Sequence, residues 1–500
     1  MEFTTVSGKR VSNRTGASPS ARRAPRKTNR LRHDCRALSK QVLDVFRHPA
    51  LWLSLAFLAN VLEGALRKWV PGFGGGVLRN VAYFSKDFLM FTGVLLMMGR
   101  AWCSSPGMEE LRKWGLPALG LIGFGGVLSL MGGFNAVGAA LTLRAILVLP
   151  LLAYCYAGCF GGRFPLMGLA FLGVVLCVAN GVLSLIQNSL PASDFLNKYA
   201  EDEMYVVELA IYGVRATGTY AYITGLGVAS AIGLWSGMVM ISLSHSRWQM
   251  VWGVVGILGG FACAFASISR GTVVTAFAML GLWALTSVRA SRMLARGILV
   301  AGAVGLALML LAPSLAERFM HVGEGTFDRF ESAGDDNLQR AVGQLPEMWQ
   351  ALSQTPFGNG LGTEQVGGNV ATKGVAGFTT YESQFPRIVA ELGIPGFLGF
   401  LVMVVAVIVS LQRTKHGPGG ARWDMVITAT QVYLLGQFYT SLVFNHTASA
   451  FVWMTVAAVF AAEPIRHGKQ RRRARKASGK QDQETSNSRP ITSDFPMTGR

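Results

Sequence analysis

The sequence predicts an all-α polytopic membrane protein with about 12 transmembrane helices and one large extracytoplasmic loop between helices 9 and 10. Hydrophobic residues make up 51% of the 500 residues, only 15% are charged, and the mean hydropathy is +0.37. Soluble proteins carry about 25% charged residues. This composition therefore excludes a soluble enzyme, a disordered scaffold and a disulfide-rich secreted module.

Apolar runs along the chain locate the predicted helices. A run of about 15–25 residues is long enough for a helix to cross a hydrocarbon core of about 30 Å. The runs lie near residues 51–70, 77–98, 116–134, 138–157, 165–189, 220–243, 249–267, 271–288, 297–312, 386–411, 424–443 and 448–462. We therefore expect one helix to span the membrane at each of these positions.

The charges between the runs predict the orientation of the helices. Every second connection carries Lys or Arg. The alternate short turns carry none and lie at 71–76, 134–137 and 444–447. Residues 1–48 hold 12 Lys or Arg against 3 acidic residues, and residues 463–500 hold 10 against 4. Since Lys and Arg concentrate on the cytoplasmic side, we expect both termini in the cytoplasm and the segments 190–219 and 313–384 outside.

These observations divide the chain into five segments. They are a basic disordered tail at 1–48, helices 1–9 within 49–312, an extracytoplasmic loop domain at 313–384, helices 10–12 within 385–462, and a second basic disordered tail at 463–500. The tails hold most of the net charge of +19. Basic tails beside an apolar body are typical of contact with anionic lipid headgroups, so the bilayer, and no nucleic acid, is the expected partner of these charges.

Ionisable residues at membrane depth are costly, so each one suggests a function. Glu63 and Arg67 are four residues apart, which favours an ion pair along one helix. Lys68 departs from the positive-inside trend. Arg144 has no acidic residue within one helical turn, so it either pairs with a distant acid or contacts a substrate. The candidate substrate contacts of the whole chain are Lys68, Lys86, Arg144 and Arg340.

Two further arginines are bracketed by Gly, Ser or Thr, small residues that let a ligand approach the backbone. Arg215 lies in the stretch VRATGTYAYITG, and Arg270 lies in SISRGTVV. The planar guanidinium of Arg donates two parallel hydrogen bonds that suit phosphate. We therefore predict that Arg215 and Arg270 bind a lipid diphosphate on the outer side, although a lone arginine can also simply extend to the membrane interface.

The outer segment and its return into the membrane carry the remaining polar residues. The stretch TPFGNGLGTE does not have the spacing of a dinucleotide fingerprint and follows no predicted strand, so a nucleotide site is not expected. Arg387 is four residues before Glu391 and either pairs with it or joins the diphosphate site. Glu382 is then a candidate catalytic base. The acidic triplet at 201–203 is interpreted as a solvated loop, and no metal site or cofactor is expected.

Four stretches together resemble one known family. They are EGALRKWVP with the later KD, VRATGTYAYITG, SRG, and WQALSQTPFGNGLG with ESQFPRIVAELGIPG. On these stretches the chain resembles the O-antigen ligase and polysaccharide polymerase superfamily of bacterial membrane glycosyltransferases. The resemblance implies a GT-C-like fold and metal-independent glycosyl transfer at the outer face of the inner membrane. It also implies a glycan donor linked by diphosphate to a polyprenol, normally undecaprenol, held by arginines at positions matching Arg215 and Arg270.

The resemblance also marks one departure. In the ligase branch a His followed by a small polar residue begins the stretch that ends in G-x-x-G. Counting back from Gly393 and Gly396, Glu382 and Ser383 hold these positions here. This departure argues against ligase activity specifically. It leaves a carboxylate in the place of the His to perform the same task, as in polymerase-like members.

The predicted function is therefore polymerisation of the repeat units of an exopolysaccharide or O-antigen. Direct displacement would invert the anomeric configuration. Transfer of a finished glycan to another acceptor by a ligase is the first alternative. A flippase for lipid-linked sugars is the second, although the unexplained charges gather on the outer half of the chain rather than along a whole translocation path. Other polysaccharide assembly and export proteins are further candidate partners.

Overall fold

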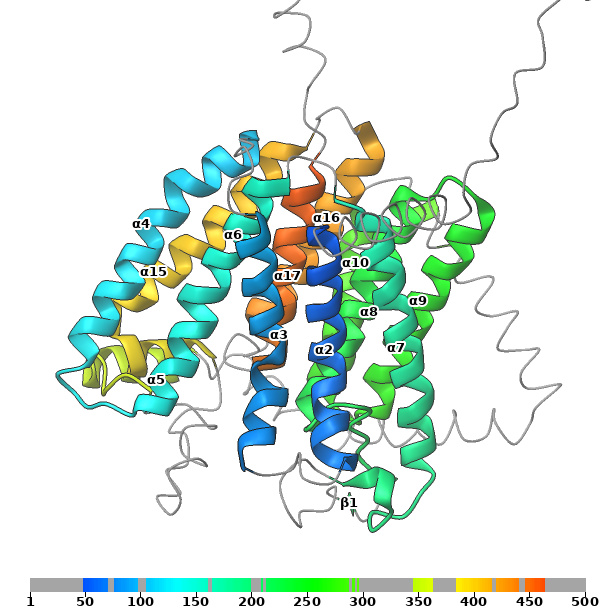
Figure 1. Ribbon diagram of the computed structural model, residues 1–500, viewed down its shortest axis with the longest axis horizontal. Helices are drawn as coiled ribbons and strands as arrows, with labels where there is room; N and C mark the ends of the chain where they lie inside the picture. Colours follow the sequence, from blue (N-terminus) through cyan, green and yellow to red (C-terminus); the bar gives the residue numbers. More distant parts are fainter. Residues whose placement is uncertain are drawn as a thin grey trace, which may run out of the picture. The chain divides into compact units, whose positions relative to one another are not determined.

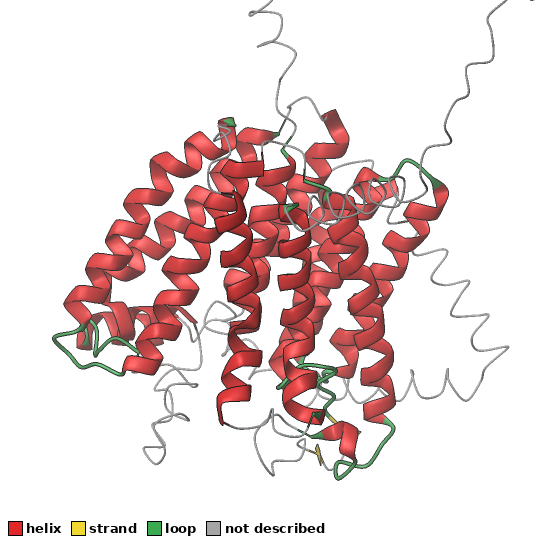
Figure 2. Ribbon diagram, viewed as in Figure 1, coloured by secondary structure: helices red, strands yellow, loops and turns green. Residues whose placement is uncertain are grey.

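The computed structural model is helical almost throughout the residues that it describes (Figures 1 and 2). These residues are 48–70, 76–97, 105–160, 164–198, 208–209, 213–286, 290–292, 295, 345–362, 384–415, 420–439 and 446–463. The two strands within them, β1 (Glu208–Leu209) and β2 (Gly213–Val214), are two residues long and pair antiparallel.

The helices follow one another in a regular order along the chain. They are α2 (Pro49–Trp69), α3 (Gly76–Met97), α4 (Pro106–Ser129), α5 (Ala136–Leu143), the π-helix η1 (Arg144–Val148), α6 (Leu149–Phe160), α7 (Leu166–Asn188), the short 3₁₀ turn η2 (Phe195–Asn197), α8 (Ile223–Leu243), α9 (Arg247–Ala266), α10 (Arg270–Leu285), α15 (Gln384–Thr414), α16 (Gly420–Tyr439) and α17 (His446–Ala462). Residues 345–354 are helical as well.

The helices confirm the prediction of a helical chain built from apolar spans. Eleven of the predicted intervals coincide with a helix or, for 138–157, with the continuous run of α5, η1 and α6. The ninth interval, 297–312, lies outside the described residues. Six of the described helices are long and apolar enough to cross a membrane. The total of 12 spans, the loop at 313–384 and the two tails stay predictions.

Two close packings organise the described helices (Figure 1). α7, α8 and α9 lie side by side, and a Cβ built on Gly237 of α8 would lie 2.5 Å from the carbonyl oxygen of Gly253 on α9. α4 packs along α15, where a Cβ on Gly125 would lie 2.5 Å from the backbone nitrogen of Gly396. The helices can approach this closely because neither position carries a side chain.

Two departures from regular helix lie close to polar residues. α15 is bent at Gly393, whose φ of 65° belongs to the left-handed region that glycine tolerates. In η1 the carbonyl oxygen of Ala145 accepts hydrogen bonds from Trp453 Nε1 at 3.1 Å and from Ser449 Oγ at 3.3 Å. Both side chains belong to α17, so this helix satisfies a carbonyl of the π-helix, a turn that is frequently found at functional sites.

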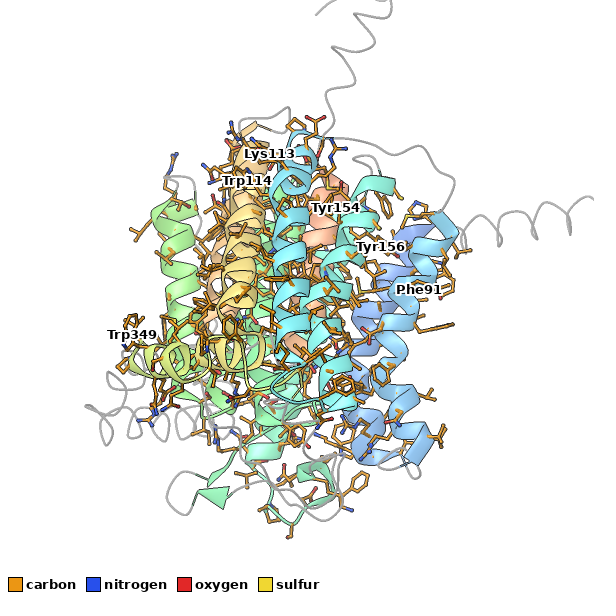
Figure 3. All side chains as sticks on the ribbon, turned by 90° about the vertical axis from the view of Figure 1, so that its left-hand side faces the viewer. Phe91, Lys113, Trp114, Tyr154, Tyr156 and Trp349 are labelled. Atoms are coloured by element: carbon orange, nitrogen blue, oxygen red, sulfur yellow. The ribbon has the colours of Figure 1, made fainter. Side chains whose placement is uncertain are left out.

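The alternating directions of the helices bring the predicted site residues to one end of the bundle. We call this end, where α2, α7 and α9 finish and α8 and α10 begin, the Arg215 end; it is the lower end in Figure 1. Trp349 lies toward this end, and Lys113 and Trp114 of α4 lie at the opposite one (Figure 3). Trp349 is 72% exposed and Trp114 47% exposed, as expected for tryptophans at two membrane interfaces.

Candidate active site

The centre of the site is the segment 215–222, which we call the Arg215 loop. Gln187 Oε1 on α7 accepts the backbone N–H groups of Thr217 at 3.1 Å and Gly218 at 2.7 Å. Asn180 Oδ1, two turns earlier on α7, accepts the backbone N–H of Thr219 at 2.8 Å and its hydroxyl at 2.9 Å. The polar side chains of α7 therefore hold three consecutive residues of this loop.

The loop brings Arg215 to the turn between α9 and α10. Arg215 Nε donates to the carbonyl oxygen of Ser267 at 3.4 Å, and the N–H of Ala216 donates to Ala266 at 3.3 Å. Arg270 is the first residue of α10, three positions after Ser267. Between them the buried Ile268 has a φ of 47°, which is rare for a β-branched residue and marks a tightly determined turn. Arg215 and Arg270 thus lie around one turn, and their binding of a diphosphate stays a prediction.

A cavity of about 290 Å³ opens beside Arg215 between α8, α10 and α16. Its lining includes several hydroxyl-bearing side chains, namely Thr224, Ser230, Ser269, Thr272 and Thr275. Ser230 Oγ and Gln437 Oε1 are buried in this lining and have no hydrogen-bond partner among the described residues. A buried polar atom without a partner is costly, so these two atoms favour a polar ligand or water in the cavity.

Lys68, a candidate substrate contact, lies at the Arg215 end and contacts the same loop. Its ammonium group donates to Thr217 Oγ1 at 2.8 Å and to the carbonyl oxygens of Gly218 at 2.7 Å and Tyr220 at 3.1 Å. The side chain is buried, with 8% of the residue exposed. Lys68 thus contacts the residues that directly follow Arg215 in the loop.

The other charges of the first spans form a buried network between α2, α3 and η1. Glu63 accepts a hydrogen bond from Arg67 at 3.1 Å, so the expected helical ion pair is present, and it also pairs with Lys86. Lys86 has no exposed surface. The aromatic ring of Tyr83 packs within this network, 4.8 Å from Lys86 Nζ.

Arg144 joins this network by pairing with a distant acid. Its Nε and one terminal nitrogen donate to the two carboxylate oxygens of Asp87 at 2.6 and 2.8 Å. This is the bidentate geometry that makes Arg–carboxylate pairs strong. Of the two interpretations of Arg144 from sequence, the structure therefore displays the ion pair, and its contact with substrate stays a prediction.

The bend in α15 forms a second polar cluster. Glu391 Oε1 accepts the N–H of Gly362 at 2.6 Å and the hydroxyl of Thr142. The N–H of Asn359 donates to the carbonyl of Ala390 at 2.6 Å. Residues 355–362 are therefore packed into the bend. Arg387, the third predicted diphosphate ligand, lies half-buried on α15, one turn before Glu391.

Two predicted site residues, Glu382 and Arg340, lie outside the described residues, as does the acidic triplet at 201–203. Among the residues that are described, no three His, Cys, Asp or Glu side chains gather closely enough to hold a metal ion.

Sequence reasoning missed the residues that support Arg215. Asn180 and Gln187 are polar and fully buried within an otherwise apolar helix. Together with Ser184 they recur at a spacing of three and four residues, which places them on one face of α7. That spacing inside a predicted span was the available signal.

A comparison with protein families finds a match over part of the chain. The family model described as O-antigen ligase matches residues 254–401. This stretch begins within α9, includes Arg270 and Glu391, and ends within α15 beyond its bend. No curated protein matches the chain.

Proposed function

Residues 254–401 form a domain of the O-antigen ligase family, and from this premise we propose that the protein polymerises glycan repeat units carried on a polyprenyl diphosphate. The family acts on lipid-linked glycans in polysaccharide assembly. The observation that carries the proposal is the position of Arg215, which lines a cavity of about 290 Å³ and bonds to the turn that leads into Arg270. Guanidinium groups suit a diphosphate in charge and in the parallel hydrogen bonds that they donate.

The proposed reaction is a direct displacement. A hydroxyl of the acceptor glycan attacks the anomeric carbon of the donor, the bond from that carbon to the diphosphate oxygen breaks, and the lipid diphosphate leaves with the electron pair. Glu382 takes the proton of the attacking hydroxyl. Arg215 and Arg270 stabilise the charge that develops on the diphosphate, and loss of one such donor typically costs about 10²–10³-fold in rate.

We further propose that the Arg215 end faces the outside of the cytoplasmic membrane and that both termini are cytoplasmic. Basic side chains at the opposite end of the described helices support this orientation. They are Arg112, Lys113, Arg247, Arg413 and Arg422. The donor would then be reached from the outer leaflet, where a lipid-linked glycan is presented after export.

A ligase is the second candidate, favoured by the description of the family model that matches. Purified protein supplied with a defined lipid-diphosphate oligosaccharide separates the candidates. A ladder of repeats supports the polymerase, and a single transfer to a different acceptor supports the ligase. Movement of the lipid-linked glycan across a vesicle membrane without a new bond supports the flippase.

Variants test the site itself. Arg215→Ala and Arg270→Ala should each lower the transfer rate by about 10²-fold or more, and Glu382→Gln should remove the base while keeping the shape of the side chain. Arg112→Ala, at an exposed position of the opposite end, is the matched control and should retain the wild-type rate. Wild-type rates in both arginine variants of the Arg215 end would refute the diphosphate site.

A further inference from the structure

We propose that Lys68 is a positioning residue that holds Arg215 in its working orientation and does not itself bind substrate. The inference rests on the proposed diphosphate site, because it gives Lys68 a role only through Arg215. The sequence suggested that Lys68 contacts substrate; here we assign it a contact with the Arg215 loop instead.

The geometry of the ammonium group carries the proposal. A lysine ammonium has three protons, and Lys68 Nζ makes three hydrogen bonds, all to the Arg215 loop, at 2.7, 2.8 and 3.1 Å. No carboxylate pairs with Lys68 among the described residues. The ring of Trp69 lies 4.7 Å from Nζ. A group whose donors are all used inside the protein has none left for a phosphate oxygen.

The acceptors lie where they control the course of the loop. Gly218, with a φ of 59°, turns the chain, and its carbonyl oxygen receives the shortest of the three bonds. Gly64, one turn before Lys68 on α2, lets the loop lie against the helix, since a Cβ there would lie 2.4 Å from the carbonyl oxygen of Thr219. α2 therefore supports the loop just after the residues that bond to the α9–α10 turn.

Two sets of contacts hold the chain at Arg215 and just after it. In the first set, Arg215 Nε and the N–H of Ala216 bond to the carbonyls of Ser267 and Ala266. In the second set, two to five residues later, Lys68 bonds to Thr217, Gly218 and Tyr220. Removing the ammonium group would take the Lys68 hydrogen bonds from three acceptors, and the loop would be left with the bond from the Thr219 hydroxyl to the carbonyl oxygen of Val61 on α2. Arg215 would then sample positions in which it no longer complements a diphosphate beside Arg270.

The first test measures the loop without any ligand. In Lys68→Met, amide hydrogen exchange at residues 216–220 should rise about tenfold or more, the scale expected for lost hydrogen bonds to a charged group. Lys113→Met removes an exposed lysine at the opposite end and should leave this exchange unchanged. Lys68→Arg, which keeps charge and donors, should restore part of the protection. Unchanged exchange in Lys68→Met would overturn the proposal.

The second test asks whether Lys68 acts through Arg215. Equilibrium binding of farnesyl diphosphate is measured for Lys68→Met, Arg215→Ala and the double variant. We expect Lys68→Met to weaken binding about tenfold or more and to add nothing when Arg215 is already absent. Losses that multiply in the double variant would show a direct contact of Lys68 with the diphosphate and would overturn the proposal.

Steady-state kinetics add a readout that general loss of stability would not produce. Lys68→Met should raise KM for the lipid-diphosphate donor while KM for the acceptor glycan stays the same. If Lys68→Met does not accumulate in the membrane, Lys68→Gln is measured instead. Its amide retains two donors, so its KM for the donor should rise less. If Arg215→Ala binds farnesyl diphosphate as the wild type does, the proposed function fails, and the exchange experiment still decides whether Lys68 holds the loop.

Discussion

Glu391 accepts a hydrogen bond at 2.6 Å from the backbone N–H of Gly362, a residue 29 positions earlier in the chain. Gly362 is the last described residue before the segment 363–383, and Glu391 follows that segment by eight positions. The bond therefore joins the two borders of the stretch that contains the candidate base Glu382. Glu391, which the sequence offered as one possible partner of Arg387, thus also bonds to the backbone of Gly362.

Replacing Glu391 should destabilise this closure. In Glu391→Ala the N–H of Gly362 and the hydroxyl of Thr142 lose their acceptor, and a buried unsatisfied polar group costs about 1–3 kcal/mol. We expect a lower Tm in detergent and a slower glycan transfer. Glu391→Gln keeps one carbonyl oxygen and should lose less of both. Equal Tm values for wild type and Glu391→Ala would contradict the role assigned to this bond.

Variants of the Arg144–Asp87 pair test whether Arg144 stabilises the fold or contacts the substrate. Removing one partner of a buried ion pair typically costs about 3–5 kcal/mol, because the other charge stays buried. Arg144→Met should therefore lower the Tm strongly, and Arg144→Met with Asp87→Leu should recover much of the loss together with transfer activity. Arg413→Met, at an exposed position, is the control. Loss of transfer at an unchanged Tm would instead indicate that Arg144 contacts substrate.

Glu463 should make stability depend on pH. Burial raises the pKa of its carboxyl from 4.5 to about 7, against hydrogen bonds from Ser105 and the backbone of Gly107 that lower it. The folded protein therefore binds the proton more tightly than the unfolded chain does. Stability is complete below about pH 4.5 and is lost as pH rises toward 7.

Glu463→Gln, which is neutral at every pH, should thus match the wild type at pH 5 and exceed it at pH 8. The difference in unfolding free energy should reach about 3 kcal/mol at most, the value of a shift of this size. Thermal unfolding in detergent at both pH values measures it. Glu109→Gln, at an exposed position in the first turn of α4, should show no such change with pH. A pH-independent Tm difference for Glu463→Gln would be inconsistent with a raised pKa.

The orientation of the bundle can be tested by labelling cells. Ser193 is exposed between α7 and α8 at the Arg215 end, and His245 is exposed between α8 and α9 at the opposite end. In a background without the native cysteines, Ser193→Cys should react with an impermeant maleimide in intact cells. His245→Cys should react only after permeabilisation. The reverse pattern would place the Arg215 end in the cytoplasm and refute the proposed donor site.

Features that depend on neighbouring residues could be predicted from the amino-acid order. The length of each apolar run placed the helices, because crossing a hydrocarbon core fixes how many apolar residues a helix needs. The pair of Glu63 and Arg67 was also predictable, since positions four apart share one face of a helix. Arg215 and Arg270 could be named as candidate diphosphate ligands because the small residues beside them are also a local pattern.

The partner of each buried charge, in contrast, became visible only in the folded chain. Lys68 bonds to residues at least 149 positions away, Arg144 to one 57 positions away, and Asn60 donates to the carbonyl of Thr447 across 387 positions. For each buried charge the sequence contains several acidic or polar groups that could be its partner. No local pattern shows which of them it is. Their pairing follows from the way the helices pack, because a buried charge is stable only beside the group that the fold brings within hydrogen-bond distance.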